Sequence, residues 1–259
     1  MKKFQLGIVQ KICLAGILIV LVAICQKIFA VNYIAAIPFV RISIGGPALI
    51  IFSSILLGPW FGLLVGAASD LIGFFIFDPK MFGAMPFFQI TAIYALLGFA
   101  SYFVFKAVHL IKNTKLMLAI ELGTFAAIFL AVLFTVLFAE SITLYQVEYE
   151  FTTVVKIVVP IVTFILLALL FVIIYFIDKS FKKRNVDVSI HHVSFACFIL
   201  EITVMLIFGS IMKVWAFSST TFIAIFFSQL VVSFFNVPLN TFLISYIMDI
   251  SGRIITSRK

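Results

Sequence analysis

The apolar residues of this chain form long stretches that polar positions interrupt only at short loops. Because a helix needs about 20 mostly apolar residues to cross a bilayer, this pattern predicts eight membrane spans. They are Ile12 to Phe29, Ile44 to Leu57, Phe61 to Phe77, Pro86 to Phe105, Leu116 to Phe138, Val154 to Ile177, Ser194 to Trp215 and Phe222 to Ile247. The second span covers only about 21 Å, so we expect a thinned bilayer or enclosing neighbours there. The first is expected to be a retained helix, since no small-residue cleavage motif ends it.

Composition places the chain in a membrane. Of its 259 residues, 64% are hydrophobic and only 11% are charged, whereas soluble domains carry about 25% charged residues. The predicted fold class is therefore all-α, a polytopic membrane protein in the lipid bilayer. The net charge of +8 comes from basic residues in short loops, which set orientation and do not indicate nucleic acid. Most of the lysines and arginines fall on one side if the N-terminus is inside, so the positive-inside rule predicts both termini in the cytoplasm, with the chain in the cytoplasmic membrane.

Enzymatic chemistry finds little support in the sequence. Cys13, Cys25 and Cys197 are unevenly spaced and build no zinc or disulfide pattern, and the three histidines lack further metal ligands. The chain has no phosphate-binding P-loop, no His-Glu metal motif and no nucleophile elbow. We therefore expect a binder or carrier that is not an enzyme and needs no metal or cofactor.

The third span carries a row of small residues and one acid. Gly62, Gly66, Ser69 and Gly73 share one helical face, where another helix can approach closely. Asp70 borders this row. An ionisable residue inside a membrane span indicates function by default. Two interpretations remain open: a structural acid bonded to neighbouring helices, or a direct contact to substrate or a coupling ion.

The last span carries the clearest polar pattern. Its polar residues follow offsets of 0, 4, 7 and 11 and so line one face over about 16 Å; they are Gln229, Ser233, Asn236 and Asn240. Amides in lipid need partners, so this face must meet protein or a polar ligand, and both interpretations stand. A weaker polar row follows the fourth span. The candidate pocket combines these rows and its expected residues are Gln89, Thr91, Tyr94, Trp215 and the four residues of the last span, which would suit a heterocyclic molecule.

Three further acids lie within or near spans. Glu201 is the other lone charge inside a span, and it serves either as a proton or ion relay or as a protonated partner of a neighbouring hydroxyl. Glu121 and Asp249 lie near the expected cytoplasmic ends of their helices, where we expect water to reach them.

Residues 41 to 98 resemble a known family. The segment RISIGGPALIIFSSILLGPWFGLLVGAASDLIG, followed by FDPKMFGAMP and FFQITAIYALLGF, is similar to the folate-type branch of the S components of energy-coupling-factor vitamin transporters. The match fixes an arginine, a proline, several glycines and an acid at set spacings. Near the C-terminus, VVSFFNVPLNTFLI resembles the last helix of that family, with its P-x-N at Pro238 and Asn240.

The chain departs from the family in two ways. Family members usually have six spans in under 200 residues, and this chain is longer. The simplest alignment gives S-component-like helices in residues 1–110, an inserted helical hairpin in 111–185 and the last two core helices in 186–259. The competing alignment makes the last two spans the addition. The first helix also lacks the A-x-x-x-A of the family, since Ile19 stands four residues after Ala15.

The resemblance implies a mechanism. An S component captures a vitamin from outside, docks on a transmembrane T component and topples to open inward, and two cytoplasmic ATPases supply the energy. Arg41 would clamp a carboxylate of the ligand, which makes folate the first choice. Two alternatives stand beside this: an ion-coupled secondary transporter that uses Asp70 and Glu201, and a membrane scaffold without transport.

Overall fold

The computed structural model describes residues 7–31, 42–77, 87–144, 147–184, 190–217 and 220–256, and these are overwhelmingly helical. The chain is an all-α polytopic membrane protein, as the sequence predicts. Its helices are α1 (Ile8–Lys27), α2 (Gly46–Leu57), α3 (Pro59–Phe77), α4 (Phe88–Val108), α5 (Thr114–Phe138), α6 (Thr153–Arg184), α7 (Ile190–Leu200), the π-helix η2 (Glu201–Phe208), α8 (Gly209–Ala216) and α9 (Phe222–Thr256). Each predicted span corresponds to one helix, the seventh being continuous through α7, η2 and α8. Seven of these spans are long and apolar enough to cross a membrane, and α2 is shorter.

Two short antiparallel strand pairs, which the span pattern did not predict, connect helices. Strand β1 (Ala30–Val31) pairs with β2 (Ile42–Ser43) before α2. Strand β3 (Ser141–Leu144) pairs with β4 (Val147–Glu150) between α5 and α6. The second pair lies between α5 and α6, and its alternation of polar and apolar residues is typical of a strand. We call this end of the bundle the β3–β4 end, and the opposite one, where α4 joins α5, the α4–α5 end.

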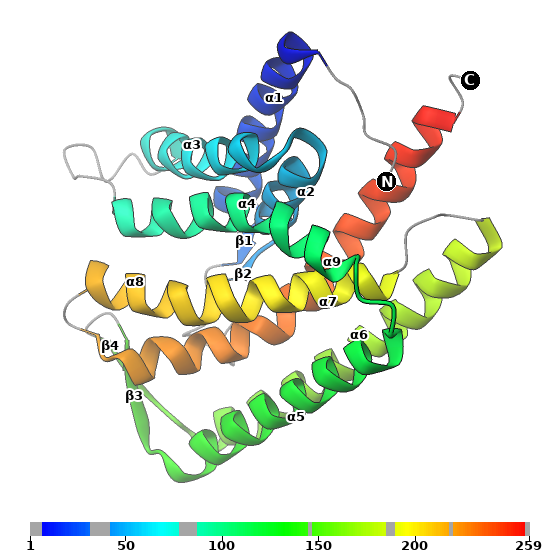
Figure 1. Ribbon diagram of the computed structural model, residues 1–259. Helices are drawn as coiled ribbons and strands as arrows, with labels where there is room; N and C mark the ends of the chain where they lie inside the picture. The colour runs from blue at the N-terminus through cyan, green and yellow to red at the C-terminus, as the bar shows by residue number, and fades with distance from the viewer. Residues whose placement is uncertain are drawn as a thin grey trace.

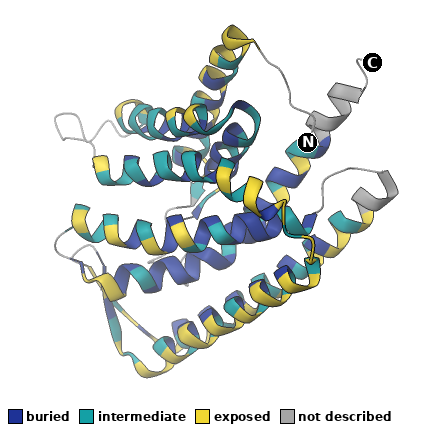
Figure 2. Ribbon diagram, viewed as in Figure 1, coloured by how far each residue is buried: buried dark blue, intermediate teal, exposed yellow. Residues whose placement is uncertain are grey.

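The helices form three groups (Figure 1). Helices α1 to α4 pack on one another, and α4 and α2 contact the α7–η2–α8 span and α9. The α5–α6 hairpin lies on the other side, against α7 and α9. The central helices α7 and α9 are accordingly the most buried, while exposed residues follow the outer face of α5 (Figure 2). The two final spans therefore lie between the first four helices and the hairpin.

Two glycines set the length of α2. Gly45, which precedes the helix, and Gly58, which follows it, have φ angles of +85° and +104°, a region that residues with a side chain rarely adopt. Pro47 stands in the first turn of α2, where a missing N–H costs nothing. The chain can therefore turn sharply at both ends of α2, which keeps this helix shorter than a full span.

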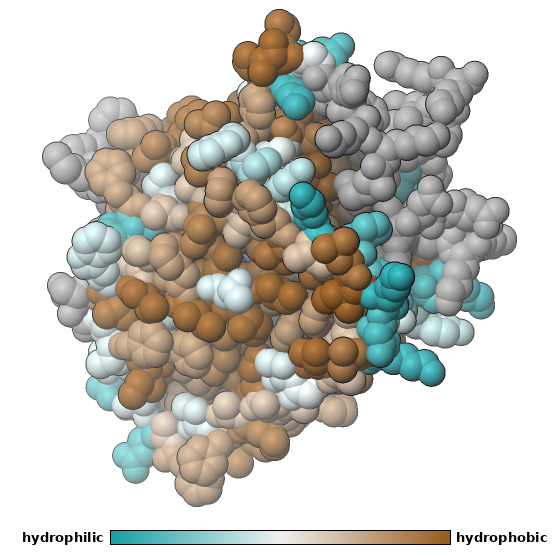
Figure 3. Space-filling view, viewed as in Figure 1, coloured by the Kyte–Doolittle hydropathy of each residue, from teal (hydrophilic) through white to brown (hydrophobic). Residues whose placement is uncertain are grey.

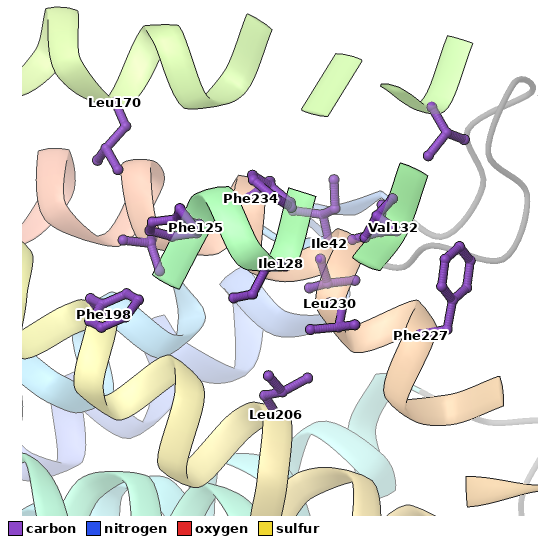
Figure 4. Packing of buried hydrophobic residues seen from close by; sticks show 14 of the residues in the cluster. Ile42, Phe125, Ile128, Val132, Leu170, Phe198, Leu206, Phe227, Leu230 and Phe234 are labelled. Atoms are coloured by element: carbon purple, nitrogen blue, oxygen red, sulfur yellow. The ribbon is translucent and has the colours of Figure 1, made fainter. Parts of the chain in front are cut away.

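Aromatic side chains join the hairpin to the centre of the bundle. The ring of Phe125 on α5 lies 5.3 Å from that of Phe198 on α7 and 5.4 Å from that of Phe234 on α9, as centroid distances (Figure 4). All three side chains are almost fully buried. Offset aromatic pairs at this separation add about 0.5–1.5 kcal/mol beyond their buried area. The α5–α6 hairpin is thus part of the packed interior.

The outer surface is largely apolar, and hydrophilic residues gather at the edges of the view (Figure 3). Large apolar side chains such as Leu64, Phe134, Phe164 and Phe176 are each more than half exposed. A water-soluble monomer rarely shows contiguous apolar patches larger than a few hundred Å². A lipid environment removes that cost, which agrees with a multi-pass membrane protein.

Candidate functional site

The small-residue row on α3 is a close contact with α4 and α2. A methyl group added at Gly62 would lie 2.6 Å from the carbonyl oxygen of Gly98 and 2.6 Å from Cβ of Ser54. A methyl group at Gly66 would overlap the carbonyl group of Tyr94. Such distances are shorter than atoms of real side chains allow, so only glycine fits. Gly62 and Gly66 therefore permit the backbones of α3 and α4 to touch.

Further along α3 the neighbours change. A methyl group at Gly73 would lie 3.1 Å from Cε of Lys27 on α1. One turn earlier, Asp70 Oδ2 accepts a hydrogen bond of 2.6 Å from the hydroxyl of Thr91 on α4. Asp70 thus bonds to a neighbouring helix, which is the structural interpretation of this acid. The same bond uses Thr91, one of the expected pocket residues.

The polar face of α9 points into the protein. Asn236 Nδ2 donates a hydrogen bond of 2.9 Å to Glu201 Oε1 at the start of η2, and both side chains are buried. Ser233 donates to the backbone carbonyl of Leu230 in its own helix. Gln229 and Asn240 are also buried, with 9% and 3% of their surface exposed. Asn236 therefore bonds to another helix, as one of the two interpretations expected. The partner of Glu201 is an amide and not the expected hydroxyl.

The structure does not bring the two polar rows together as one pocket. Thr91, and Gly98 two turns later, face α3, whereas Asn236 faces η2. Of the remaining expected pocket residues, Gln89 and Tyr94 are partly exposed, and Trp215 near the end of α8 is 70% exposed. Trp215 therefore lies on the surface. Arg41, the expected clamp, lies outside the described residues.

Glu121 and Asp249 are less exposed than the sequence predicted. Both were expected to be reached by water, yet they are 4% and 7% exposed. Glu121 Oε1 accepts a hydrogen bond of 2.6 Å from the hydroxyl of Ser194 on α7. Glu121 is buried because α7 packs over the first turns of α5 and excludes solvent there. Sequence reasoning therefore undervalued Glu121.

A second polar group was missed, at the beginning of α2. The Gln26 side chain on α1 is 4% exposed, and among the described residues its amide oxygen and nitrogen have no hydrogen-bond partner. The buried hydroxyl of Ser43 likewise has none in this part of the chain. Both side chains lie against Gly46, where an added methyl would be 2.6 Å from Gln26 Cγ and 2.8 Å from Ser43 Oγ. Gln26 stands beside Lys27 near the end of its span, so its position along the chain did not single it out.

These arrangements offer hydrogen bonding and proton exchange more readily than metal binding. The described residues hold no group of three or more His, Cys, Asp or Glu side chains that could bind a metal. Of their buried acids, Glu121 meets the hydroxyl of Ser194 and Glu201 meets the amide of Asn236. Comparisons with protein-family models, with curated proteins and with solved structures returned no match.

Proposed function

We propose that this chain is a substrate-binding membrane subunit for vitamin uptake, of the S-component type, with folate or a related vitamin as its ligand. The observation that carries the proposal is the motif of residues 41 to 98 together with its fold. The glycines of that motif stand where the backbone needs them, at the positive φ angles of Gly45 and Gly58 and at the contacts of Gly62, Gly66 and Gly98. A sequence resemblance gains weight when the glycines that it rests on are required by the backbone.

The packing of the helices agrees with a six-span core plus an added hairpin. Helices α5 and α6 pack against each other and against α7 and α9. Helices α2 and α4 contact the two final spans directly, and α1 and α3 pack on α2. The six spans that remain when the hairpin is set aside therefore form one connected bundle. This supports the alignment in which residues 111–185 are the insertion.

In the proposed arrangement both termini and the α4–α5 end face the cytoplasm, and the β3–β4 end faces outside. The ligand enters from the outer side, where Arg41 pairs with its carboxylate and Asn240 and Gln229 read its heterocycle. Because the sequence contains no P-loop, the energy comes from partners: a T component and two cytoplasmic ATPases.

Binding measurements test the ligand assignment. Isothermal titration with folate on detergent-solubilised protein should show tight binding, and Arg41→Ala should weaken it about tenfold or more, because a charged hydrogen bond is worth about 1.5–3 kcal/mol. Asn240→Ala should weaken it about two- to tenfold, since a neutral bond is worth about 0.5–1.5 kcal/mol. Asn113→Ala serves as the matched control. That side chain accepts from the Leu116 N–H as the cap of α5, so its loss should lower stability and leave affinity unchanged.

Transport measurements test the energy source. Proteoliposomes that contain only this chain should bind the vitamin without accumulating it, and addition of a T component with its ATPases and ATP should start accumulation. Concentrative uptake by the chain alone would overturn the proposal in favour of an ion-coupled carrier. Absence of any small-molecule binding would favour a scaffold. A mass spectrum of molecules that copurify with the protein identifies the ligand directly.

A further inference from the structure

Two acids lie buried inside the membrane-spanning part of the bundle, on different helices. Glu121 on α5 and Glu201 at the start of η2 are 4% and 3% exposed. Each carboxyl group accepts a hydrogen bond from a side chain on another helix. Glu121 accepts from the hydroxyl of Ser194 at 2.6 Å, and Glu201 accepts from the amide of Asn236 at 2.9 Å. Each thus meets a neutral donor from another helix. An isolated charge buried in this way is costly.

Side chains capable of proton exchange lie between the two acids. Ser194, Cys197 and Glu201 follow offsets of 0, 3 and 7 and share one face over about 10 Å. Cys197, which lies on this face between Ser194 and Glu201, is buried. The fully buried hydroxyl of Thr241 on α9 lies beside the same thiol. A buried hydroxyl is thus next to the thiol that separates Ser194 from Glu201 along the span.

The backbone is irregular where Glu201 meets Asn236. Glu201 begins the eight-residue π-helix η2, and π-helical turns occur frequently at functional sites. Two residues after Asn236, Pro238 lies inside α9 and removes one backbone hydrogen bond of that helix. Both helices therefore depart from regular geometry at the contact that holds the deeper acid. This observation is independent of the acids themselves.

Two histidines lie near the α4–α5 end of this row of polar groups. His192, two residues before Ser194, lies with Nε2 3.0 Å from the carbonyl oxygen of Ile111, and its ring centroid is 5.7 Å from that of His109. Among the described residues, the buried Nδ1 of His192 has no hydrogen-bond partner. Glu121 lies about 10 Å along α5 from its first residue, and Glu201 about 16 Å along its span from Ile190. The sequence of groups thus leads from the end of the bundle to its middle.

We propose that Glu201 is a proton-binding site in the middle of the membrane, and that protons reach it from the α4–α5 end through Glu121. In each transfer the bridging hydroxyl or thiol accepts one proton on its lone pair and passes its own to the next group, so that one proton enters for each that leaves. The occupant is a proton and not a metal cation, because Ser194 and Asn236 present hydrogen-bond donors to the carboxyl groups. The proposal stands whether or not the chain binds a vitamin.

Other charged and titratable groups surround this route. Lys213 on α8 acts electrostatically on Glu201. Among the side chains that the structure describes, the remaining titratable groups on the elements packed around the two acids are Tyr94, Tyr102 and Lys106 on α4 with His109 after it, Lys115 on α5, Lys156, Tyr175, Asp178 and Lys179 on α6, His191 and His192 on α7, and Tyr246 and Asp249 on α9. The experiment must therefore assign signals to the two glutamates by substitution.

Infrared difference spectroscopy of the full-length protein in lipid, recorded after a rapid change of pH, tests the proposal. The wild type should show two signals of buried carboxyl groups that respond to pH. Glu201→Gln should remove one of them. Glu121→Gln should remove the other and slow the response of Glu201 at least tenfold. Glu148→Gln is the matched control, since Glu148 also accepts a 2.6 Å bond from a serine but on the exposed β4 strand, and it should change neither buried signal.

Thr241→Val provides a second test that leaves both acids in place. It removes the hydroxyl beside the Cys197 thiol and should slow the response of Glu201 by a similar factor. Carboxyl signals that do not respond to pH would overturn the proposal, because the acids would then be permanently protonated structural groups. An unchanged response of Glu201 in the folded Thr241→Val or Glu121→Gln protein would overturn the route through Glu121.

Discussion

Replacement of Gly98 by alanine isolates the energetic role of the contact between α3 and α4. A methyl group at Gly98 would overlap the carbonyl group of Gly62, which belongs to the backbone and cannot rotate away. The two helices must therefore move apart along the segment that also holds the bond between Asp70 and Thr91. No such obstacle exists at Gly123 on α5, where nothing lies within 4 Å of an added methyl.

The expected magnitude follows from two opposing terms. Overpacking costs about 1–3 kcal/mol, whereas alanine gains up to about 1 kcal/mol over glycine in helix propensity. The net loss at Gly98 should be about 1 kcal/mol, which corresponds to a lower Tm by roughly 2–4 °C for a chain of this size. Gly123→Ala keeps only the propensity term and should raise Tm by a few degrees.

Thermal unfolding in detergent, followed by intrinsic fluorescence, measures both variants under identical conditions. Gly62→Ala combined with Gly98→Ala should cost less than the sum of the two single changes, because one separation of the helices accommodates both methyl groups. Equal shifts of Tm for Gly98→Ala and Gly123→Ala would refute the assignment of a glycine-dependent contact. Additive losses in the double variant would refute the idea that the two glycines share one contact.

Two further predictions concern topology and a buried bond. In a background without native cysteines, a cysteine at Tyr149 should react with a membrane-impermeant thiol reagent from outside, and one at Lys112 only after permeabilisation; labelling of both from the same side would contradict the eight-span topology. Ser194→Ala should lower stability by about 1–3 kcal/mol in melting experiments, because Glu121 loses its buried partner. Thr135→Ala, whose hydroxyl bonds only to its own exposed helix, should change little, and an equal loss in both would show that the bond to Glu121 has no special weight.

The sequence predicted the helices well because span length and apolar content are local properties. The ends of the predicted spans agree with the observed helices to within about four residues, except where charged turns extend a helix at Arg184 and Thr256. The period of the polar face of α9 likewise predicted that Asn236 and Asn240 turn inward. Helical periodicity reports which face is buried, and needs no knowledge of the neighbour.

The identity of that neighbour could not be predicted, since it depends on how the spans assemble. Nothing in the sequence indicates that Asn236 meets Glu201, or that α7 covers Glu121 and removes it from water. The π-helix at Glu201 to Phe208 has no local marker either, because its residues are ordinary for an apolar helix. Proximity to a helix end was a poor guide to exposure for Glu121, which α7 covers, and for Asp249, which is 7% exposed.

The place of α9 between the first helices and the hairpin has a consequence for how the protein is made. Its amide and hydroxyl side chains make it costly to hold alone in lipid, and it leaves the ribosome after α7 and η2. By that time α7 and η2, with the carboxyl group that receives Asn236, have already been synthesised. The most polar span therefore enters the membrane after the helices that provide its hydrogen-bond partners. Truncation before α9 would leave Glu201 without the amide of Asn236. It would also expose to lipid the surfaces of α2 and α6 that α9 covers, so we expect such a fragment to be degraded.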